Sequence, residues 1–306
     1  MHDHGSVSEG PQTPTSKRRL AWALGVTGLV LVVEIVGGIL SGSLALIADA
    51  AHMAADSMGL VIALITAHLM ARPRSDRWTW GFARAEILGA GLQAGLLTVL
   101  SVVIVWQAVE RLFNPEVIEP IPMLIVGAIG LTANVASMGL LFGGRKDSLN
   151  LRAAFLEVTA DALGSVAVIV AALIALWTGW FYADSIASLA ISLMIGFRAI
   201  AILRQAVRVL LERTPDGLDL GEVRDAMMAF PQVVEVHDLH ASQIGTGVNV
   251  LTAHVVVSDQ CVKDGETVSL LHSLQNLLAD SFGVSINHAT IQIDSEKHAE
   301  HEKLAH

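Results

Sequence analysis

The chain has 306 residues, of which 53% are hydrophobic and only 16% are charged, and its formal net charge at pH 7 is −10. This length fits one large or two ordinary domains, and so low a charged fraction argues against a purely soluble protein. The acidic balance excludes nucleic acid as an expected partner, and the single cysteine, Cys261, excludes both an internal disulfide framework and a cysteine-rich metal site. We expect this cysteine to be a buried or half-buried strand residue.

The first 16 residues are polar, and an apolar run begins only after Lys17, Arg18 and Arg19. We therefore expect a disordered N-terminal tail over residues 1–16 and no cleavable signal peptide. The last stretch, residues 296–306, contains several histidines and is expected to be a second solvated tail.

Six segments are long and apolar enough to cross a bilayer, which takes about 20 mostly apolar residues each. Turn residues such as Ser41-Gly42-Ser43 and Thr178-Gly179 separate them. The spans are expected near residues 20–40, 44–69, 85–111, 121–143, 153–177 and 183–206. A soluble helical bundle would need polar helix faces, and stretches such as 96–105 and 166–176 have none.

Basic residues lie on one side of these predicted spans. They precede the first span, follow the second, separate the fourth from the fifth and end the sixth, whereas the other loops carry almost none. The positive-inside rule then places both termini in the cytoplasm, and the expected location is the inner or plasma membrane. We expect the membrane domain to cover residues 17–213.

The composition becomes that of a soluble domain after Thr214. Residues 220–230 and 268–281 have helical spacing, and residues 233–239, 248–257 and 289–294 have the pattern of strands. This α-β-β-α-β order predicts a small α+β domain over residues 214–295, with helices on one face of a short sheet.

Ionisable residues interrupt two of the apolar spans at helical spacing. His52 and Asp56 are one turn apart on a predicted helix, Asp49 lies three residues before His52, and Glu157 and Asp161 repeat the pairing about a hundred residues later. Such groups are costly inside a bilayer and usually mark an ion pathway. One imidazole and three carboxylates also suit a tetrahedral divalent-metal site.

Other polar residues in the spans allow less specific interpretations. Asp49 could relay protons, hold a hydrogen bond to His52, or make a simple contact between helices. Glu34 and Asn134 are expected to be hydrogen-bond partners between helices rather than metal ligands.

Four sequence stretches together resemble the cation diffusion facilitator family of divalent-metal efflux transporters. They are Ser41-Gly-Ser-Leu-Ala-Leu-Ile-Ala-Asp-Ala-Ala-His-Met-Ala-Ala-Asp56, Gly81-Phe-Ala-Arg-Ala-Glu-Ile-Leu88, Ala154-Phe-Leu-Glu-Val-Thr-Ala-Asp-Ala-Leu-Gly-Ser165 and Val236-His-Asp-Leu-His240. The resemblance runs from about residue 17 to 294. It implies six transmembrane helices, a cytoplasmic ferredoxin-like domain, a homodimer, and exchange of a cytosolic metal ion for protons.

The resemblance also implies roles for individual residues. His52, Asp56, Glu157 and Asp161 match the transport site of the family. Metal ligands of the cytoplasmic domain, which in this family senses metal and dimerises, match His237, His254, His272 and Asp294. Surface histidines without metal are the alternative there. Arg84 and Glu212 match a charge pair at the membrane edge that helps to lock the dimer, and a plain interfacial arginine is the alternative.

Glu157 departs from the pattern of zinc-selective members, which usually have histidine at this position. A carboxylate makes the site harder and more anionic, which admits Mn²⁺, Fe²⁺, Co²⁺ or Cd²⁺ beside zinc. Zinc stays the first expectation, and an exporter selective for these other ions is the alternative.

Two other classes of protein remain to be separated from a metal exporter. A membrane-bound metal sensor would bind metal in the cytoplasmic domain and carry no flux. An exporter of organic cations would need an aromatic site, whereas the ionisable residues here are flanked by alanine and glycine. We expect no enzyme activity and no cofactor, with metal ions, protons and membrane lipid as partners.

Overall fold

The computed structural model describes residues 14–142, 149–286 and 288–299. Within this part, the side chains of residues 14–24, 27, 60, 63, 149–154, 157 and 299 lie outside the described set. The predicted tails therefore fall mostly outside the described residues, and so does the side chain of Glu157.

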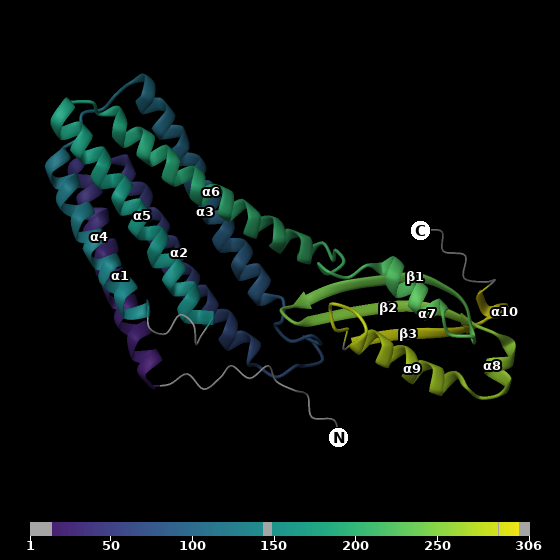
Figure 1. Ribbon diagram of the computed structural model, residues 1–306. Helices are drawn as coiled ribbons and strands as arrows, with labels where there is room; N and C mark the ends of the chain where they lie inside the picture. The colour runs from purple at the N-terminus through teal and green to yellow at the C-terminus, as the bar shows by residue number, and fades with distance from the viewer. Residues whose placement is uncertain (1–13, 143–148, 287, 300–306) are drawn as a thin grey trace. The chain divides into compact units, whose positions relative to one another are not determined.

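Six long helices form at the predicted spans (Figure 1). They are α1 (Pro14–Ser41), α2 (Leu44–Met70), α3 (Ala85–Phe113), α4 (Pro120–Phe142), α5 (Leu149–Thr178) and α6 (Tyr182–Leu210). Among the described residues, α2 to α6 contain spans that are long and apolar enough to cross a membrane, and the described residues of α1 include the shorter apolar stretch Gly28–Ser41. The predicted breaks are also present, because Gly42 and Gly179 follow helix ends with φ of 67° and 68°, a conformation that side chains other than glycine rarely adopt.

The chain divides into two compact units. The first contains the chain up to Val61 together with Gln93–Ala201, and the second contains Ile62–Leu92 together with the chain from Ile202 onward. Helices α2, α3 and α6 therefore contribute one part to each unit. The domain boundary near residue 214 stays a prediction.

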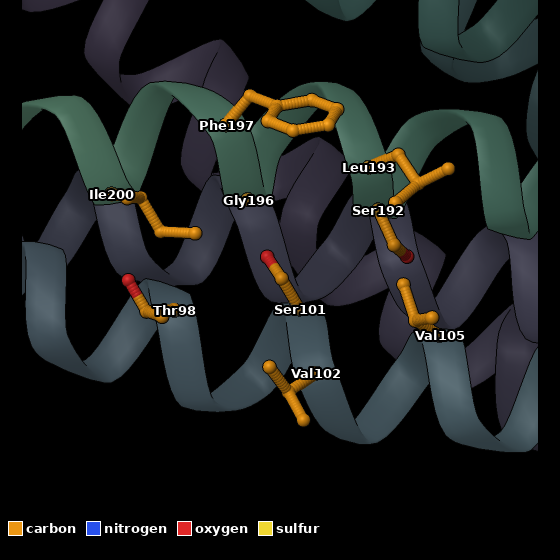
Figure 2. A pocket seen from close by; sticks show the side chains of 9 residues that line it. All are labelled: Thr98, Ser101, Val102, Val105, Ser192, Leu193, Gly196, Phe197 and Ile200. Atoms are coloured by element: carbon orange, nitrogen blue, oxygen red, sulfur yellow. The ribbon is translucent and has the colours of Figure 1, made fainter.

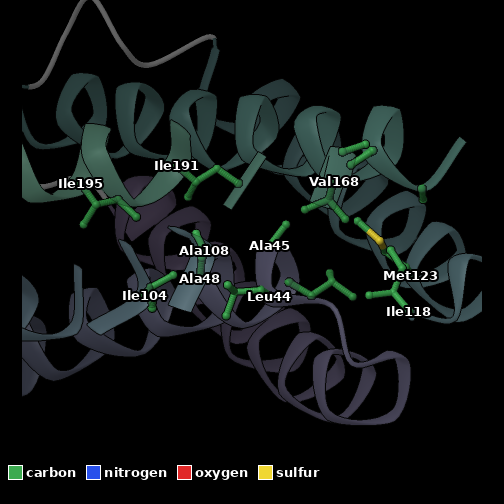
Figure 3. Close-up of a cluster of buried hydrophobic side chains, with 14 of the residues drawn as sticks. Leu44, Ala45, Ala48, Ile104, Ala108, Ile118, Met123, Val168, Ile191 and Ile195 are labelled. Atoms are coloured by element: carbon green, nitrogen blue, oxygen red, sulfur yellow. The ribbon is translucent and has the colours of Figure 1, made fainter. Parts of the chain in front are cut away.

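The core of the first unit consists mainly of small and branched apolar side chains (Figure 3). Ala45 and Ala48 of α2, Ala108 of α3 and Val168 of α5 are among its buried residues. Helix α4 packs against both α1 and α5. Small residues let helix backbones approach closely, which is how helices associate in lipid, so this core brings polar positions on different helices near one another.

The C-terminal part of the second unit has the predicted α-β-β-α-β order, with two short helices added. Its elements are α7 (Leu220–Met228), β1 (Val233–Gly245), β2 (Val248–Val257), α8 (Asp259–Lys263), α9 (Thr267–Asp280), β3 (His288–Ser295) and α10 (Glu296–Ala299). The sheet is three-stranded in the order β1-β2-β3, with β1 antiparallel and β3 parallel to β2. Buried side chains of α7 and α9, such as Val223 and Leu274, belong to the same hydrophobic cluster as β2 residues such as Leu251 and Val255. The predicted membrane-helical plus α+β fold class is confirmed.

The interpretation of Cys261 as a strand residue is wrong. Cys261 is buried as expected, but it lies in α8, whose first turn is capped by the Ser258 side chain, which accepts a hydrogen bond from the Cys261 amide at 3.4 Å. Burial raises the pKa of the thiol, and the nearby carboxylates of Glu266 and Asp264 raise it further. The thiol is therefore a packing group rather than a reactive nucleophile.

Candidate metal centre

Helix α2 carries the first half of the predicted site. His52 is buried, and its Nε2 lies 3.3 Å from Oδ2 of Asp56, one helical turn further along. Asp56 keeps partial exposure. This contact follows from the sequence alone, because side chains at i and i+4 lie one above the other on a helix.

Helix α5 brings the second half to the same imidazole. Oδ1 of Asp161, which is buried, lies 3.8 Å from Nε2 of His52. One ring nitrogen therefore lies between carboxylates of two helices that are more than a hundred residues apart in sequence. Glu157 is on the same helix as Asp161, four residues earlier, and its side chain lies outside the described residues.

These spacings fit a divalent metal ion as a transported substrate. A tetrahedral ion with bonds of about 2.1 Å holds its ligand atoms about 3.4 Å apart, which is close to both separations from the His52 nitrogen. No group of three or more His, Cys, Asp or Glu side chains within the described part of the chain is arranged as a complete metal shell. A complete set of metal ligands therefore requires a small movement of the described side chains, the contribution of the Glu157 side chain, or both.

The hydrogen bond to His52, one of the three interpretations of Asp49, is not among the contacts of the described residues. It is buried and faces α5, where a Cβ atom built on Gly164 would lie 2.8 Å from its Oδ1. Glycine at position 164 therefore makes room for this carboxylate. The remaining interpretations of Asp49 are a proton relay and a contact between helices.

A buried carboxylate that the sequence analysis did not identify holds the start of α2. Asp184, at the beginning of α6, is 1% exposed and accepts hydrogen bonds from the Ser43 hydroxyl at 2.6 Å, the Leu44 amide at 2.8 Å and the Ala45 amide at 3.2 Å. Arg111 of α3 lies 3.8 Å from the same carboxylate and donates to the carbonyl oxygen of Gly42 at 2.8 Å.

Asp184 thus caps α2 from another helix, satisfying amide groups that a helix leaves without partners at its first turn. The only sequence signal was an acidic residue in the first turn of a span, which any helix start would favour.

A pocket between α3 and α6 contains no metal-ligating groups (Figure 2). It has a volume of about 180 Å³, and its surface is apolar even though Thr98, Ser101 and Ser192 are among the residues that line it. The remaining lining side chains are apolar. This pocket is therefore separate in character from the carboxylate and imidazole site.

Arg84 and Glu212 form the predicted ion pair within the second unit, with Nη2 and Oε1 2.7 Å apart. Both side chains are partly exposed, so the pair by itself contributes little stability. Glu212 has a φ of 57°, which is unusual for a residue with a side chain and fixes the turn that follows α6. The role of the pair in locking a dimer stays a prediction.

The cytoplasmic-type domain gathers part of its predicted ligand set. His237 and His254 face each other across β1 and β2 with ring centroids 5.3 Å apart, and Nδ1 of His254 lies 3.7 Å from Asp294 of β3. His272 is exposed on α9 and makes no ion pair or ring contact with them among the residues the structure describes. Within one chain, His272 therefore does not join His237, His254 and Asp294 in a single cluster.

Three residues that the sequence analysis did not predict as ligands join this cluster. Asp238 lies 3.8 Å from His254 and 2.8 Å from His240, and His298 of α10 lies 3.7 Å from Asp294. Asp238 and His240 belong to the quoted Val236 to His240 motif, and His298 follows Asp294 at the i+4 spacing. These two signals could have identified them.

Comparison with known proteins gives matches over nearly the whole chain. The pattern described as the cation efflux transmembrane domain matches residues 20–211, and that described as the cation efflux protein, cytoplasmic domain, matches residues 215–296.

Characterised relatives are similar over comparable lengths. The zinc transporter ZitB of Escherichia coli is 40% identical over 295 residues, covering 96% of this chain and 92% of that protein. The metal cation efflux system protein CzcD of Cupriavidus metallidurans is 41% identical, with 96% and 89% covered. The cadmium, cobalt and zinc/H(+)-K(+) antiporter of Bacillus subtilis is 34% identical, with 89% and 87% covered.

Proposed function

This chain belongs to the cation efflux family, and on that premise we propose that it exports divalent metal cations, zinc foremost, in exchange for protons. The metal binds from the cytosol at His52, Asp56, Glu157 and Asp161. The observation that carries this proposal is the imidazole nitrogen of His52 placed between carboxylates of α2 and α5 inside the membrane bundle.

The chemistry of these ligands couples metal to protons. Metal binding requires ionised carboxylates and a neutral imidazole, so protons arriving from the far side compete with the metal for the same atoms. A carrier whose site opens alternately to the two sides then uses one gradient to drive the other. The exchange forms and breaks coordination and O–H or N–H bonds only, so the proposed function needs neither a cofactor nor an enzymatic step.

Selectivity for zinc is supported by the names of two relatives, which specify zinc. The Bacillus subtilis relative is also named for cadmium and cobalt, which agrees with a broader range for a site that has a carboxylate at position 157. We propose zinc as the main substrate, with Mn²⁺, Fe²⁺, Co²⁺ and Cd²⁺ as secondary substrates.

The setting of the transporter is part of the proposal. The distribution of basic residues supports a multi-pass protein of the inner or plasma membrane with both termini in the cytoplasm. The match to a cytoplasmic domain of dimerising type supports a homodimer, with Arg84 and Glu212 at the membrane edge. Metal bound in the cytoplasmic domain would regulate transport.

Asp161→Asn and Asp56→Asn should each abolish zinc transport, because each removes an anionic ligand that has no neighbouring replacement. The measurement is zinc uptake into proteoliposomes that contain the purified full-length protein and a zinc-sensitive dye. Glu110→Gln removes an exposed carboxylate of α3 and serves as the matched control. Zinc uptake at the wild-type rate in either aspartate variant would place the transport site elsewhere, and a wild type that binds zinc without flux would favour the sensor.

A further inference from the structure

A second polar cluster lies in the first unit, apart from the metal ligands. Glu34 of α1 is 1% exposed, and its Oε2 has no hydrogen-bond partner among the described residues. The same is true of Nδ2 of Asn134 on α4, which is 3% exposed, and of Oγ of Ser165 on α5, which is 1% exposed. The sequence predicted that Glu34 and Asn134 would be partners between helices, and the structure gives these atoms none.

Two of these side chains, Glu34 and Ser165, lie next to Gly130 of α4, where the missing side chain leaves room for them. A Cβ atom built on Gly130 of α4 would lie 2.8 Å from Oε1 of Glu34 and 3.2 Å from Oγ of Ser165. Asn134 is one turn further along the same face of α4. Helices α1 and α5 therefore place a carboxyl group and a hydroxyl next to Gly130, and the buried amide of Asn134 belongs to the next turn of α4. We call these three residues the Glu34 cluster (Glu34, Asn134, Ser165).

The Glu34 cluster lies near the candidate metal site but shares no residue with it. Ser165 is one helical turn beyond Asp161, and the adjacent Gly164 makes room for Asp49. The titratable side chains with an electrostatic influence on Glu34 are Asp49 of α2 and Asp161 of α5, and α4 faces it with the uncharged Gly130. In the described part of the chain, Glu34 makes no ion pair with His52, Asp56 or Asp161.

We propose that Glu34 holds a proton which is exchanged for the metal ion, and this inference rests on the proposed export function. An isolated ionised carboxylate is very costly in an apolar interior, whereas a neutral carboxyl group can donate its hydrogen to a neighbouring oxygen. Among the described residues, neither the hydroxyl of Ser165 nor the amide nitrogen of Asn134 donates a hydrogen bond to Glu34 that would stabilise its ionised form. When the metal is absent, a proton neutralises the carboxylate of Glu34. When the metal is present, its positive charge offsets that of the carboxylate and the proton is no longer required.

The exchange balances in charge and bonds. When a divalent ion enters the site from the cytosol, the O–H bond of Glu34 breaks, the carboxylate keeps the electron pair, and the proton leaves to cytosolic water. When the ion leaves on the other side, a proton from that side re-forms the bond. One proton thus crosses opposite to the metal through Glu34, in addition to those displaced from the metal ligands themselves.

Glu34→Gln tests the inference, because the amide imitates a permanently neutral carboxyl group. In proteoliposomes with one dye for zinc and one for pH, the variant should carry zinc down a zinc gradient but move about one proton fewer per zinc ion than the wild type. Glu110→Gln is the control and should keep the wild-type ratio. An unchanged ratio in Glu34→Gln would overturn the inference, whereas a wild type that moves no zinc would overturn the proposed function instead.

A binding measurement keeps the test independent of transport. Infrared spectra of the full-length protein near neutral pH should contain a band of a neutral carboxyl group that zinc removes and that Glu34→Asp displaces. A band that neither zinc nor Glu34→Asp alters would contradict the proposal. The transport assay is also run with potassium in place of sodium. If Glu34→Gln abolishes a dependence of zinc transport on one of these cations and leaves the number of protons per zinc ion unchanged, the cluster binds that cation and the proton proposal is wrong.

Discussion

At the scale of residues, the proposed transport site is defined by the atom that each of its four positions would offer to the metal. His52 supplies the one nitrogen whose position is described, and Asp56 and Asp161 approach it from two helices. Position 157 then determines whether the site has one nitrogen and three oxygens or two of each. Since carboxylate oxygens are harder ligands than imidazole nitrogen, this single residue sets the balance between zinc and oxygen-preferring ions.

Glu157→His should shift the metal preference toward zinc. The substitution exchanges an anionic oxygen ligand for a neutral nitrogen ligand that suits Zn²⁺, and it lowers the negative charge of the site by one. We expect the ratio of zinc to manganese transport to rise roughly tenfold, equivalent to about 1.4 kcal/mol. Uptake by both proteins with the two metals offered together measures this ratio. An unaltered preference would mean that Glu157 does not contact the transported ion.

At the scale of elements, the position of α2 depends on a residue of another helix. Asp184 of α6 accepts hydrogen bonds from the amides of Leu44 and Ala45, and Ser43 donates its hydroxyl to the same carboxylate. These contacts fix the end of α2 that is nearest in sequence to Asp49 and His52. A helix end held in this way keeps the metal ligands of α2 at a constant depth relative to those of α5.

Asp184→Ala should destabilise the membrane domain by about 3 kcal/mol, because it leaves the buried donors of Ser43, Leu44 and Ala45 at the start of α2 without their acceptor. Asp184→Asn should cost less, since its amide oxygen still accepts a hydrogen bond. Apparent melting temperatures of the purified proteins in detergent measure the effect, with Glu110→Gln as the control. If Asp184→Ala melted together with the wild type, the cap would be dispensable.

At the scale of the whole molecule, the membrane helices are followed by a part of the chain that matches the cytoplasmic domain of cation efflux proteins. In the C-terminal part, His254 lies between Asp238 and Asp294, carboxylates of two different strands. Among the described residues, the hydrophobic core of this part is formed by side chains from Leu218 onward. This part therefore has a hydrophobic core of its own, so we expect it to fold without the membrane helices, and metal binding there stays a prediction.

A fragment of residues 214–299 should fold, dimerise and bind zinc, and His254→Ala should weaken that binding at least roughly tenfold because it removes the group between two carboxylates. Calorimetry measures the affinity, and sedimentation measures the association state. His288→Ala, which changes an exposed histidine, is the control. Equal weakening by His272→Ala would show that this residue reaches the site from the partner subunit, and wild-type affinity in His254→Ala would reduce the cluster to surface ion pairs.

The sequence by itself determined the elements and the local pairs. Long apolar runs separated by glycine and serine form helices in lipid, because a helix hydrogen-bonds all backbone polar groups within its own segment. The i, i+4 spacing likewise made the contact of His52 with Asp56 predictable.

Tertiary packing decided the contacts between positions that are distant in sequence. The approach of Asp161 to His52, the capping of α2 by Asp184 and the gathering of Glu34 and Ser165 at Gly130 each depend on the rotation and depth of one helix against another. Periodicity identifies the faces of a helix but not the neighbour that each face meets. That choice is made by the close packing of small side chains such as Ala48 and Ala108 between the helices.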